Sequence, residues 1–170
     1  QNVWAIRNEG LNRLDEQTGS FKKYLDRTPV NFVLADREGN LWCSTFQGVF
    51  KYDQELDNFL KFTDESGLTN TPSFWMDEDS EQNIWIAAVA GIIRLDKDRK
   101  NAVLFGKNQA VNVGALTGNP FIRQNGEILV GDSTGFFEID PSLLQKQSSA
   151  PFINISGFLL SNTRVQPSAQ

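Results

Sequence analysis

The sequence predicts an all-β chain that forms part of a β-propeller, and three observations carry this prediction. The stretch DREGNLWCSTFQGVFKYD at 36–53 recurs in altered form as DSEQNIWIAAVAGIIRLD at 79–96. The tryptophans of the two stretches, Trp42 and Trp85, are 43 residues apart. Each stretch divides into short segments rich in β-branched and aromatic residues, with apolar and polar positions alternating. A period of about 40–45 residues that contains four short strands is typical of a propeller blade.

The repeat has four copies in register along the chain. Successive copies are offset by 38, 43 and 44 residues. Each copy places an aromatic residue or leucine, a glycine and an aspartate at the same mutual spacing: Trp4, Gly10 and Asp15; Trp42, Gly48 and Asp53; Trp85, Gly91 and Asp96; Leu129, Gly135 and Asp140.

The second copy defines the strands that we expect in a complete blade, at 30–36, 41–46, 48–53 and 58–62. The first copy begins inside its second strand, and the last copy has three expected strands. The sequence therefore predicts about four blades, two of them incomplete, with 14 strands and negligible helix. The three strands expected in the last copy are 119–124, 127–132 and 135–140.

Most of the repeated residues have a structural explanation. Asp36 and Asp79 begin a turn in which a carboxylate accepts hydrogen bonds from the following backbone amides. Gly39 and Gly126 suit the positive-φ position of that turn, where Gln82 carries a small penalty. Tryptophan on the second strand is large enough to fill the space between blades. We expect Trp4, Trp42 and Trp85 to be buried in equivalent sites, with Gly48, Gly91 and Gly135 just past the second turn.

Composition excludes several functional classes. The 16 basic and 21 acidic residues give a net charge of −5, which disfavours general binding to nucleic acid. The chain has no histidine and one cysteine, so histidine-based catalysis, histidine-ligated metals and an internal disulfide are excluded. We expect Cys43 to be a small buried hydrophobe, the basic run 97–100 to be a solvated hairpin tip, and no cofactor or metal to be bound.

The repeated words resemble the two-component regulator propeller repeat, D-x-x-G-N-L-W-I-G-T-x-x-G-L-x-R-F-D. The second copy departs from it at Cys43-Ser44, the third lacks the turn glycine, and the fourth has Leu129 in place of tryptophan. The residues of the second copy that match the pattern are Asp36, Gly39, Asn40, Leu41, Trp42, Thr45, Gly48 and Asp53.

The tail resembles the junction between the last blade of such propellers and the Ig-like domain called Y_Y_Y. This resemblance implies three segments: propeller blades at 1–141, a linker at 142–150, and the first strands of the Ig-like β-sandwich at 151–170. The residues that fit the opening of that domain are Pro151, Ile153, Ile155, Phe158 and Asn162.

The family resemblance implies a periplasmic sensor segment of a hybrid two-component system of Bacteroides-type bacteria. Such sensors detect oligosaccharides released from polysaccharides, and their parent proteins carry a transmembrane helix and a cytoplasmic histidine kinase. The kinase reaction needs a phosphoacceptor histidine, which these 170 residues lack. The resemblance therefore implies a non-enzymatic segment whose partners are an oligosaccharide and either the remaining blades of a parent propeller or another copy of the chain.

Ligand-binding residues are expected on the face where the loops between blades meet the middle hairpins. These loops are 25–29, 63–72 and 106–113, and the hairpin tips lie near 7–9, 46–47 and 89–90. Trp75, aligned with Phe32 on the innermost strand, either stacks on a sugar ring or fills the core. The candidates are Trp75, Phe32, Arg27, Asp64, Asn70, Asn108 and Asn112.

Two other functions stay open at the level of sequence. Asp77, Glu78, Asp79 and Glu81 offer the paired carboxylates of a propeller glycosidase or lyase, although Asp79 belongs to the repeat turn. A solvated strand end explains the same cluster. The third possibility is a protein-interaction module without a small ligand.

Overall fold

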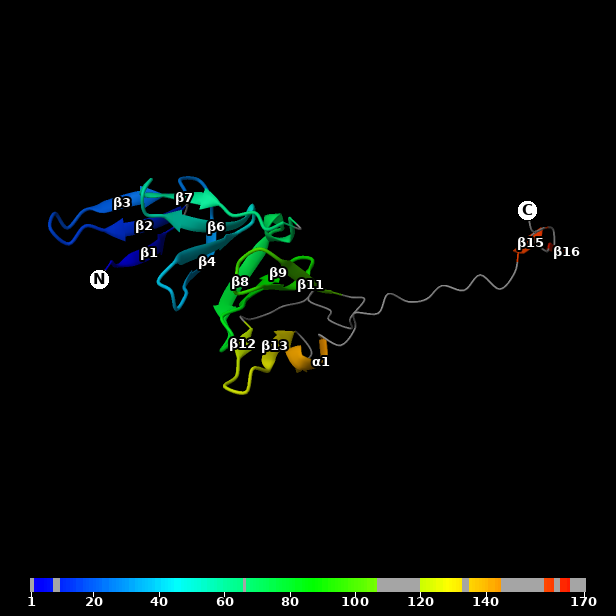
Figure 1. The fold of residues 1–170 in the computed structure, drawn as a ribbon. Helices are drawn as coiled ribbons and strands as arrows, with labels where there is room; N and C mark the ends of the chain where they lie inside the picture. The colour runs from blue at the N-terminus through cyan, green and yellow to red at the C-terminus, as the bar shows by residue number, and fades with distance from the viewer. Residues whose placement is uncertain are drawn as a thin grey trace.

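The structure, a computed structural model, describes residues 2–7, 10–65, 67–106, 120–132, 135–144, 158–160 and 163–165. Four consecutive antiparallel sheets form the blades, and each begins where the sequence repeat predicts (Figure 1). Blade 1 contains β1 (Trp4–Arg7), β2 (Gly10–Leu14) and β3 (Phe21–Tyr24). Blade 2 contains β4 (Val30–Ala35), β5 (Leu41–Thr45), β6 (Gly48–Asp53) and β7 (Asn58–Lys61). Blade 3 contains β8 (Ser73–Glu78), β9 (Ile84–Ala88), β10 (Gly91–Leu95) and β11 (Ala102–Phe105). Blade 4 contains β12 (Phe121–Ile122), β13 (Ile128–Asp132) and β14 (Gly135–Ile139).

The strands of each blade follow one another as a meander, and every neighbouring pair is antiparallel. The predicted all-β propeller blades, with three, four, four and three strands, are confirmed in the described residues. Helix in those residues is limited to the single turns η1 (Leu68–Asn70) and α1 (Pro141–Leu144). Strand β12 is shorter than the expected strand at 119–124. The hairpin of β15 (Phe158–Leu160) and β16 (Thr163–Val165) lies in the segment predicted to open an Ig-like domain, and that assignment stays a prediction.

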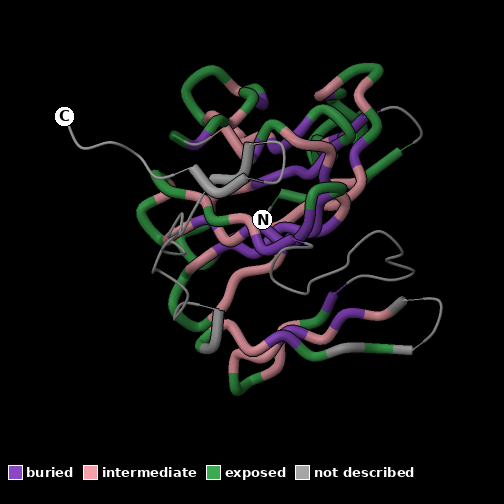
Figure 2. The backbone as a smooth tube through the Cα atoms, turned by 90° about the vertical axis from the view of Figure 1, so that its right-hand side faces the viewer, coloured by how far each residue is buried: buried purple, intermediate pink, exposed green. Residues whose placement is uncertain are grey.

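Three apolar clusters hold neighbouring blades together, one at each junction. Figure 2 shows the buried residues in purple. The junction between blades 2 and 3 illustrates the pattern. Trp42 and Val49 of blade 2 pack with Met76, Ile84 and Ile86 of blade 3, and all five side chains are fully buried. Because strand side chains alternate between the two faces of a sheet, each complete blade contributes one face to each neighbour.

The repeated tryptophans occupy these junctions, but their burial differs. Trp42 and Trp85 are 0% and 1% exposed, as predicted. Trp4 is half-buried, so the prediction of three equivalent buried sites is wrong for this residue. Trp42 lies opposite Leu34 of the innermost strand β4. In the described residues no strand lies beside β1 in the place that β4 has in blade 2, and this leaves Trp4 without that cover.

Each tryptophan packs against an aromatic residue 20 positions later, on the last strand of its blade or just after it. The ring centroids are 5.1 Å apart for Trp4 and Tyr24, 5.0 Å for Trp42 and Phe62, and 5.8 Å for Trp85 and Phe105. The residue directly opposite each tryptophan on the neighbouring strand is a cation that lies over the indole ring. These cations are Arg13 over Trp4, Lys51 over Trp42 and Arg94 over Trp85.

The glycine that opens the third strand of the repeat is required by a close backbone approach in blades 1 to 3. A Cβ atom on Gly48, whose φ is 110°, would lie 2.6 Å from the carbonyl oxygen of Thr69. A Cβ atom on Gly91 would lie 2.3 Å from the carbonyl oxygen of Phe105. The middle hairpin and the loop to the next blade are therefore in backbone contact at this point, which explains why the glycine recurs.

The junction between blades 1 and 2 also contains a polar cluster around Asp57, a residue with a left-handed backbone (φ 46°). The carboxylate of Asp57 accepts hydrogen bonds from Lys22 at 2.5 Å, from Tyr24 at 2.8 Å and from Tyr52. The guanidinium of Arg13 contacts it at 3.1 Å. Hydrogen bonds from Lys22, Tyr52 and Tyr24 hold the pKa of Asp57 below its ordinary value. Burial, together with the bond to Asp57, raises the pKa of each tyrosine to about 12.

Replacing Gly48 by alanine is expected to lower the free energy of unfolding by about 3 kcal/mol or more, because backbone atoms must move apart. Gly39→Ala is the matched control, since Gly39 also has a positive φ of 84° but nothing lies within 4 Å of an added Cβ. That control should cost about 1–2 kcal/mol, the ordinary penalty of a left-handed residue. Urea denaturation measures both values. Equal losses would show that the contact with Thr69 is not the reason for the glycine.

The two tyrosines of the chain are both in the Asp57 cluster, so phenolate absorbance reports on it directly. The folded chain should titrate near 12, whereas the chain unfolded in guanidinium should titrate near 10, about the ordinary tyrosine value. Because the folded pKa is raised, the linked stability is complete below about pH 10 and is lost as pH rises through 12. Asp57→Asn removes the anion and should move the folded titration toward 10. A folded wild-type chain that titrates near 10 would contradict the cluster.

Candidate functional site

The acidic turn and the tryptophan of the repeat are joined by a direct hydrogen bond. In blade 2 the indole Nε1 of Trp42 donates to the carboxylate of Asp36 at 2.8 Å, and Asn40 donates to it through its backbone amide at 2.7 Å and through its side chain. In blade 3 the indole of Trp85 donates to Asp79 at 2.7 Å, and Asn83 takes the place of Asn40. The left-handed turn residues expected at 39, 82 and 126 are confirmed, with φ of 84°, 67° and 88°.

In blade 4 both the aspartate of the turn and the tryptophan of the repeat are replaced by other residue types. Leu129 has no indole N–H, and the aspartate of the turn is replaced by Arg123. The guanidinium of Arg123 contacts Glu127 at 2.9 Å and Glu138 at 2.5 Å. Glu138 lies opposite Leu129, in the position that Arg94 has opposite Trp85. The charges of the set are therefore inverted, and Arg123 retains partners of opposite charge.

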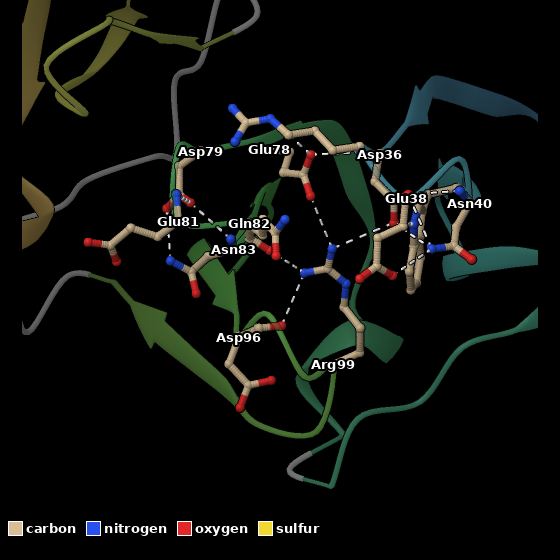
Figure 3. Close-up of polar contacts among 12 residues, drawn as sticks. Asp36, Glu38, Asn40, Glu78, Asp79, Glu81, Gln82, Asn83, Asp96 and Arg99 are labelled. Atoms are coloured by element: carbon tan, nitrogen blue, oxygen red, sulfur yellow. Dashed lines mark hydrogen bonds and ion pairs between the residues drawn. The ribbon is translucent and has the colours of Figure 1, made fainter.

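Arg99 links blades 2 and 3, and Figure 3 shows its contacts. Its guanidinium lies 3.6 Å from the carboxylate of Asp36 and 3.3 Å from that of Glu78, and it donates to the carbonyl oxygens of Gln82 and Asp96 at 2.6 and 3.1 Å. The Arg99 side chain is 12% exposed, so the prediction of a solvated basic tip is wrong for this residue. The sequence pattern missed it because a left-handed backbone (φ 60°) turns this one residue of the run inward.

The electrostatics of Asp36 depend on these donors. Burial alone would raise the pKa of the Asp36 carboxyl, but hydrogen bonds from Trp42 and Asn40, together with the charge of Arg99, hold it below its ordinary value. The side chain of Asp36 is fully buried, so its charge is tolerated only because several donors and a cation surround it.

Three of the four carboxylates considered for glycosidase or lyase chemistry are engaged in the scaffold. Asp79 forms the repeat turn, and Asp77 accepts a hydrogen bond from the backbone amide of Glu78 at 2.8 Å. Glu78 points toward blade 2, where it accepts a hydrogen bond from the backbone amide of Arg37 at 2.9 Å, and it also contacts Arg99 of its own blade. Glu81 is exposed. The contacts of Glu78 direct it away from Asp79, so the two do not form a facing pair of the kind that glycoside hydrolysis uses.

The middle hairpins and the loops between blades meet on one face of the molecule, as predicted. The hairpin 46–47 contacts the loop at Thr69 and Asn70 through Gly48, and the backbone amide of Val89 donates to the carbonyl oxygen of Pro72 at 3.0 Å. We call this side the loop face. The sequence analysis predicts ligand binding on this face.

The predicted ligand residues are not gathered in one place. Trp75 is 4% exposed and belongs to the core between blades 3 and 4, where half-buried Phe32 packs beside it at 6.4 Å between ring centroids. Arg27 and Asn70 are exposed on the loop face. Asp64 is 4% exposed, and its carboxylate accepts hydrogen bonds from the backbone and hydroxyl of Thr69. Asn108 and Asn112 lie outside the described residues.

An aromatic pair that sequence reasoning missed lies on the loop face. Phe46 of the middle hairpin is 55% exposed, and its ring centroid is 5.8 Å from that of Phe74 in an edge-on arrangement. Phe74 is the extra residue of a bulge in β8, and Asn31 holds the same place in β4. The side chain of Asn31 donates to the carbonyl oxygen of Ser73 at 2.8 Å, which ties the two bulges together. The exposed equivalent of Phe46 in blade 3 is Val89. Strand periodicity gave no signal for the bulges.

Other features of the described residues bear on site chemistry. A cleft of about 500 Å³ lies away from the loop face and is lined in part by Lys51, Asp53, Glu55 and Lys61. Cys43 is fully buried, and burial raises the pKa of its thiol.

In the described part of the chain no three histidine, cysteine, aspartate or glutamate side chains gather as metal ligands. Among the same residues, no helix reaches the length and apolar character that a membrane crossing requires.

Comparison with known proteins identifies the fold. No family model matches the chain, and no curated protein sequence matches it. Among solved structures, the extracellular domain of a proposed hybrid two-component system, BT3049 of B. thetaiotaomicron, superposes with a TM-score of 0.75 at 17% identity over 98% of this chain. The extracellular domain of BT4673 from the same organism gives 0.61 at 18% identity over 97% of this chain. Virginiamycin B lyase from Staphylococcus aureus gives 0.57 at 12% identity over 82% of this chain and 52% of the lyase.

These likenesses show that the chain has the propeller fold of two-component sensor domains, which confirms the resemblance found in the sequence at the level of fold. The chain spans about a quarter of the length of the two sensor domains, 25% for BT3049 and 22% for BT4673.

Replacing Arg99 by glutamine should lower the free energy of unfolding by about 3 kcal/mol, because it leaves the buried carboxylate of Asp36 without its cation and leaves Glu78 with Arg37 alone. Lys97→Gln is the control, since Lys97 is an exposed cation of the same run and its loss should change stability by less than about 0.5 kcal/mol. Adding Glu78→Gln to the Arg99 variant should recover part of the loss. Equal effects of Arg99→Gln and Lys97→Gln in urea denaturation would contradict a structural link between the blades.

Proposed function

We propose that this chain is a non-enzymatic, extracytoplasmic sensor segment of a two-component signalling protein and that its ligand is an oligosaccharide. The observation that carries the proposal is the match of 98% of the chain to the extracellular domain of a hybrid two-component system. In this proposal the parent protein continues into an Ig-like domain, a membrane helix and a histidine kinase, and the propeller relays ligand binding toward the membrane.

The loop face at the junction of blades 2 and 3 is the proposed ligand site. Phe46 presents an exposed ring beside Phe74, and the C–H groups of a sugar can pack on such rings. Asn70 is exposed next to the hairpin that carries Phe46, and its amide can both donate to and accept from sugar hydroxyls. Rigid strands hold these loops, an arrangement that favours recognition by preformed surfaces.

The arrangement of polar groups favours binding over catalysis. Asp77, Glu78 and Asp79 have partners within the scaffold. The virginiamycin B lyase that shares the fold is catalytically inactive when one of its histidines is replaced by alanine, and the present 170 residues contain no histidine. A lyase reaction would therefore need different chemistry here.

A glycan array followed by calorimetric titration with the captured oligosaccharide tests the proposal. Phe46→Ala and Asn70→Ala should each weaken binding about tenfold or more without changing the melting temperature, because both residues are exposed. Leu56→Ala, an exposed apolar residue on another hairpin, should leave binding unchanged. Trp75→Ala should lower the free energy of unfolding by about 3–5 kcal/mol, because Trp75 is buried.

The outcomes separate the alternatives. Failure to bind any glycan, together with capture of a protein partner through Phe46, would support the protein-interaction module instead. Turnover of a glycan by the purified chain, lost on replacing Asp77 or Glu78, would show an enzyme. Loss of binding in a Trp75→Ala variant that keeps its melting temperature would move the site to the core of the propeller.

A further inference from the structure

The junction of blades 2 and 3 contains one complete site for a guanidinium group, and Arg99 fills it (Figure 3). Blade 2 contributes the carboxylate of Asp36, 3.6 Å from the Arg99 guanidinium. Blade 3 contributes the carbonyl oxygens of Gln82 and Asp96, at 2.6 and 3.1 Å. The guanidinium also lies over the ring of Trp42, 5.8 Å from its centroid. The site thus combines an anion, two carbonyl acceptors and an indole ring, which are the partners that a guanidinium prefers.

The same set of groups recurs at the junction of blades 3 and 4, where it lines a cleft of about 250 Å³. The turns that supply the first carbonyl oxygen have the same backbone. Gln82 and Gly126 are both left-handed, and the amide of each donates to the carbonyl oxygen three residues earlier. The equivalents by repeat spacing are Asp79 for Asp36, Trp85 for Trp42, Gly126 for Gln82 and Asp140 for Asp96.

The residue that supplies the cation is not repeated. Leu143 aligns with Arg99 and carries no charge. In the described residues no ion pair includes Asp79. The two carboxylates also differ in burial, since Asp36 is 5% exposed and Asp79 is half-buried. The second junction therefore retains the acceptors and the ring of the site without the arginine of the repeat.

The charges around the cleft are compatible with a bound cation. Arg94 lines the cleft and lies over the ring of Trp85. Lys51 lies over Trp42 in the same way, and Arg99 shares that ring. A cation on the strand opposite the tryptophan therefore does not exclude a second one.

The cleft differs from the Arg99 site in its second carboxylate. Glu78, which also contacts Arg99, aligns with the uncharged Ile122. Glu81 is exposed and lines the cleft, so it supplies negative charge nearer to the solvent. This arrangement suits a ligand that binds reversibly, because one close carboxylate and an exposed one attract a cation less strongly than two buried carboxylates do.

We propose that the cleft between blades 3 and 4 binds the guanidinium group of a ligand that is not part of this chain, in the position that Arg99 has at the preceding junction. A guanidinium is planar, weakly hydrated and able to stack on an indole ring, whereas Ca²⁺ takes about six to eight oxygen ligands. In the part of the chain that the structure describes, no three carboxylates gather as such ligands. The turn that carries Asp79 and the hairpin at 89–90 lie at opposite ends of β9, so this site is separate from the loop face and does not depend on oligosaccharide binding there.

NMR titration of the ¹⁵N-labelled chain with ethylguanidinium, at concentrations well below those that denature proteins and at constant ionic strength, tests the site. The indole N–H signal of Trp85 should shift to saturation, because this N–H donates to the Asp79 carboxylate that the guanidinium contacts. The signal of Trp42 should not shift, since Arg99 fills the equivalent site. Ethylammonium should bind at least about fivefold more weakly, because it is more strongly hydrated and does not stack.

Two pairs of variants locate the binding. Glu81→Gln should weaken binding about threefold, whereas Glu38→Gln, at the exposed equivalent in blade 2, should leave it unchanged. Ser142 is exposed and lines the cleft, so Ser142→Arg places a guanidinium of the chain itself at the site and should abolish the response of Trp85 to ethylguanidinium. Ser142→Ala should retain the response. All four substitutions are at exposed residues, and the amide spectrum checks that each variant is folded.

The source of the group is identified by comparing agmatine with a blocked Gly-Arg-Gly tripeptide. Tighter binding of agmatine indicates a small guanidino compound, and tighter binding of the tripeptide indicates an arginine side chain of a polypeptide. Either result supports the site. Absence of a saturable shift at Trp85, equal shifts at Trp85 and Trp42, or equal affinity for ethylammonium overturns the proposal.

Discussion

Burial of the two apolar faces of each sheet against the sheets on either side is the constraint on which the rest of the structure depends. Val49 faces blade 3 while Cys43, on the same sheet, faces blade 1, so blade 2 cannot bury its apolar residues alone. A repeat architecture of this kind derives its stability from the interfaces between units. In such an interface Trp42 packs edge-on against Phe62 with 5.0 Å between ring centroids, and equivalent aromatic pairs recur at the other two junctions.

A tryptophan in such an interface needs a hydrogen-bond acceptor within the protein, because its indole N–H is removed from water. Asp36 and Asp79 meet this requirement, and the asparagines of the turn fix the carboxylates in place. An unpaired buried donor would cost about 1–3 kcal/mol, and an unpaired buried carboxylate would cost more. The aspartate and the tryptophan therefore depend on each other. Blade 4 agrees with this dependence, since the residue that replaces tryptophan has no N–H to satisfy and Arg123 stands in place of the aspartate.

Sequence reasoning succeeded where a residue's role depends on the repeat and failed where it depends on a single backbone irregularity. The strands, the left-handed turn position at Gln82 and the glycine at 48 follow from periodicity and local backbone geometry. Arg99 looked like one member of a solvated run, because the run gives no sign that its backbone turns inward. Phe74 was missed because a bulge breaks the alternation from which strand faces are inferred. The half-burial of Trp4 depends on which strands surround β1, and no local pattern encodes that information.

The same contrast indicates where function resides in a repeat protein. Positions that keep their residue type from blade to blade serve the interfaces, as Gly48, Trp42 and Asp36 do, and are occupied by scaffold contacts. Positions that occupy equivalent places but change their chemistry are free of that requirement. The bulges carry asparagine at 31 and phenylalanine at 74, and the tips of the middle hairpins carry phenylalanine at 46 and valine at 89. These positions gather on the loop face, so the regular frame holds a variable surface at fixed geometry. Specific recognition on this fold requires that variation, because identical blades would present the same chemistry at every point around the axis.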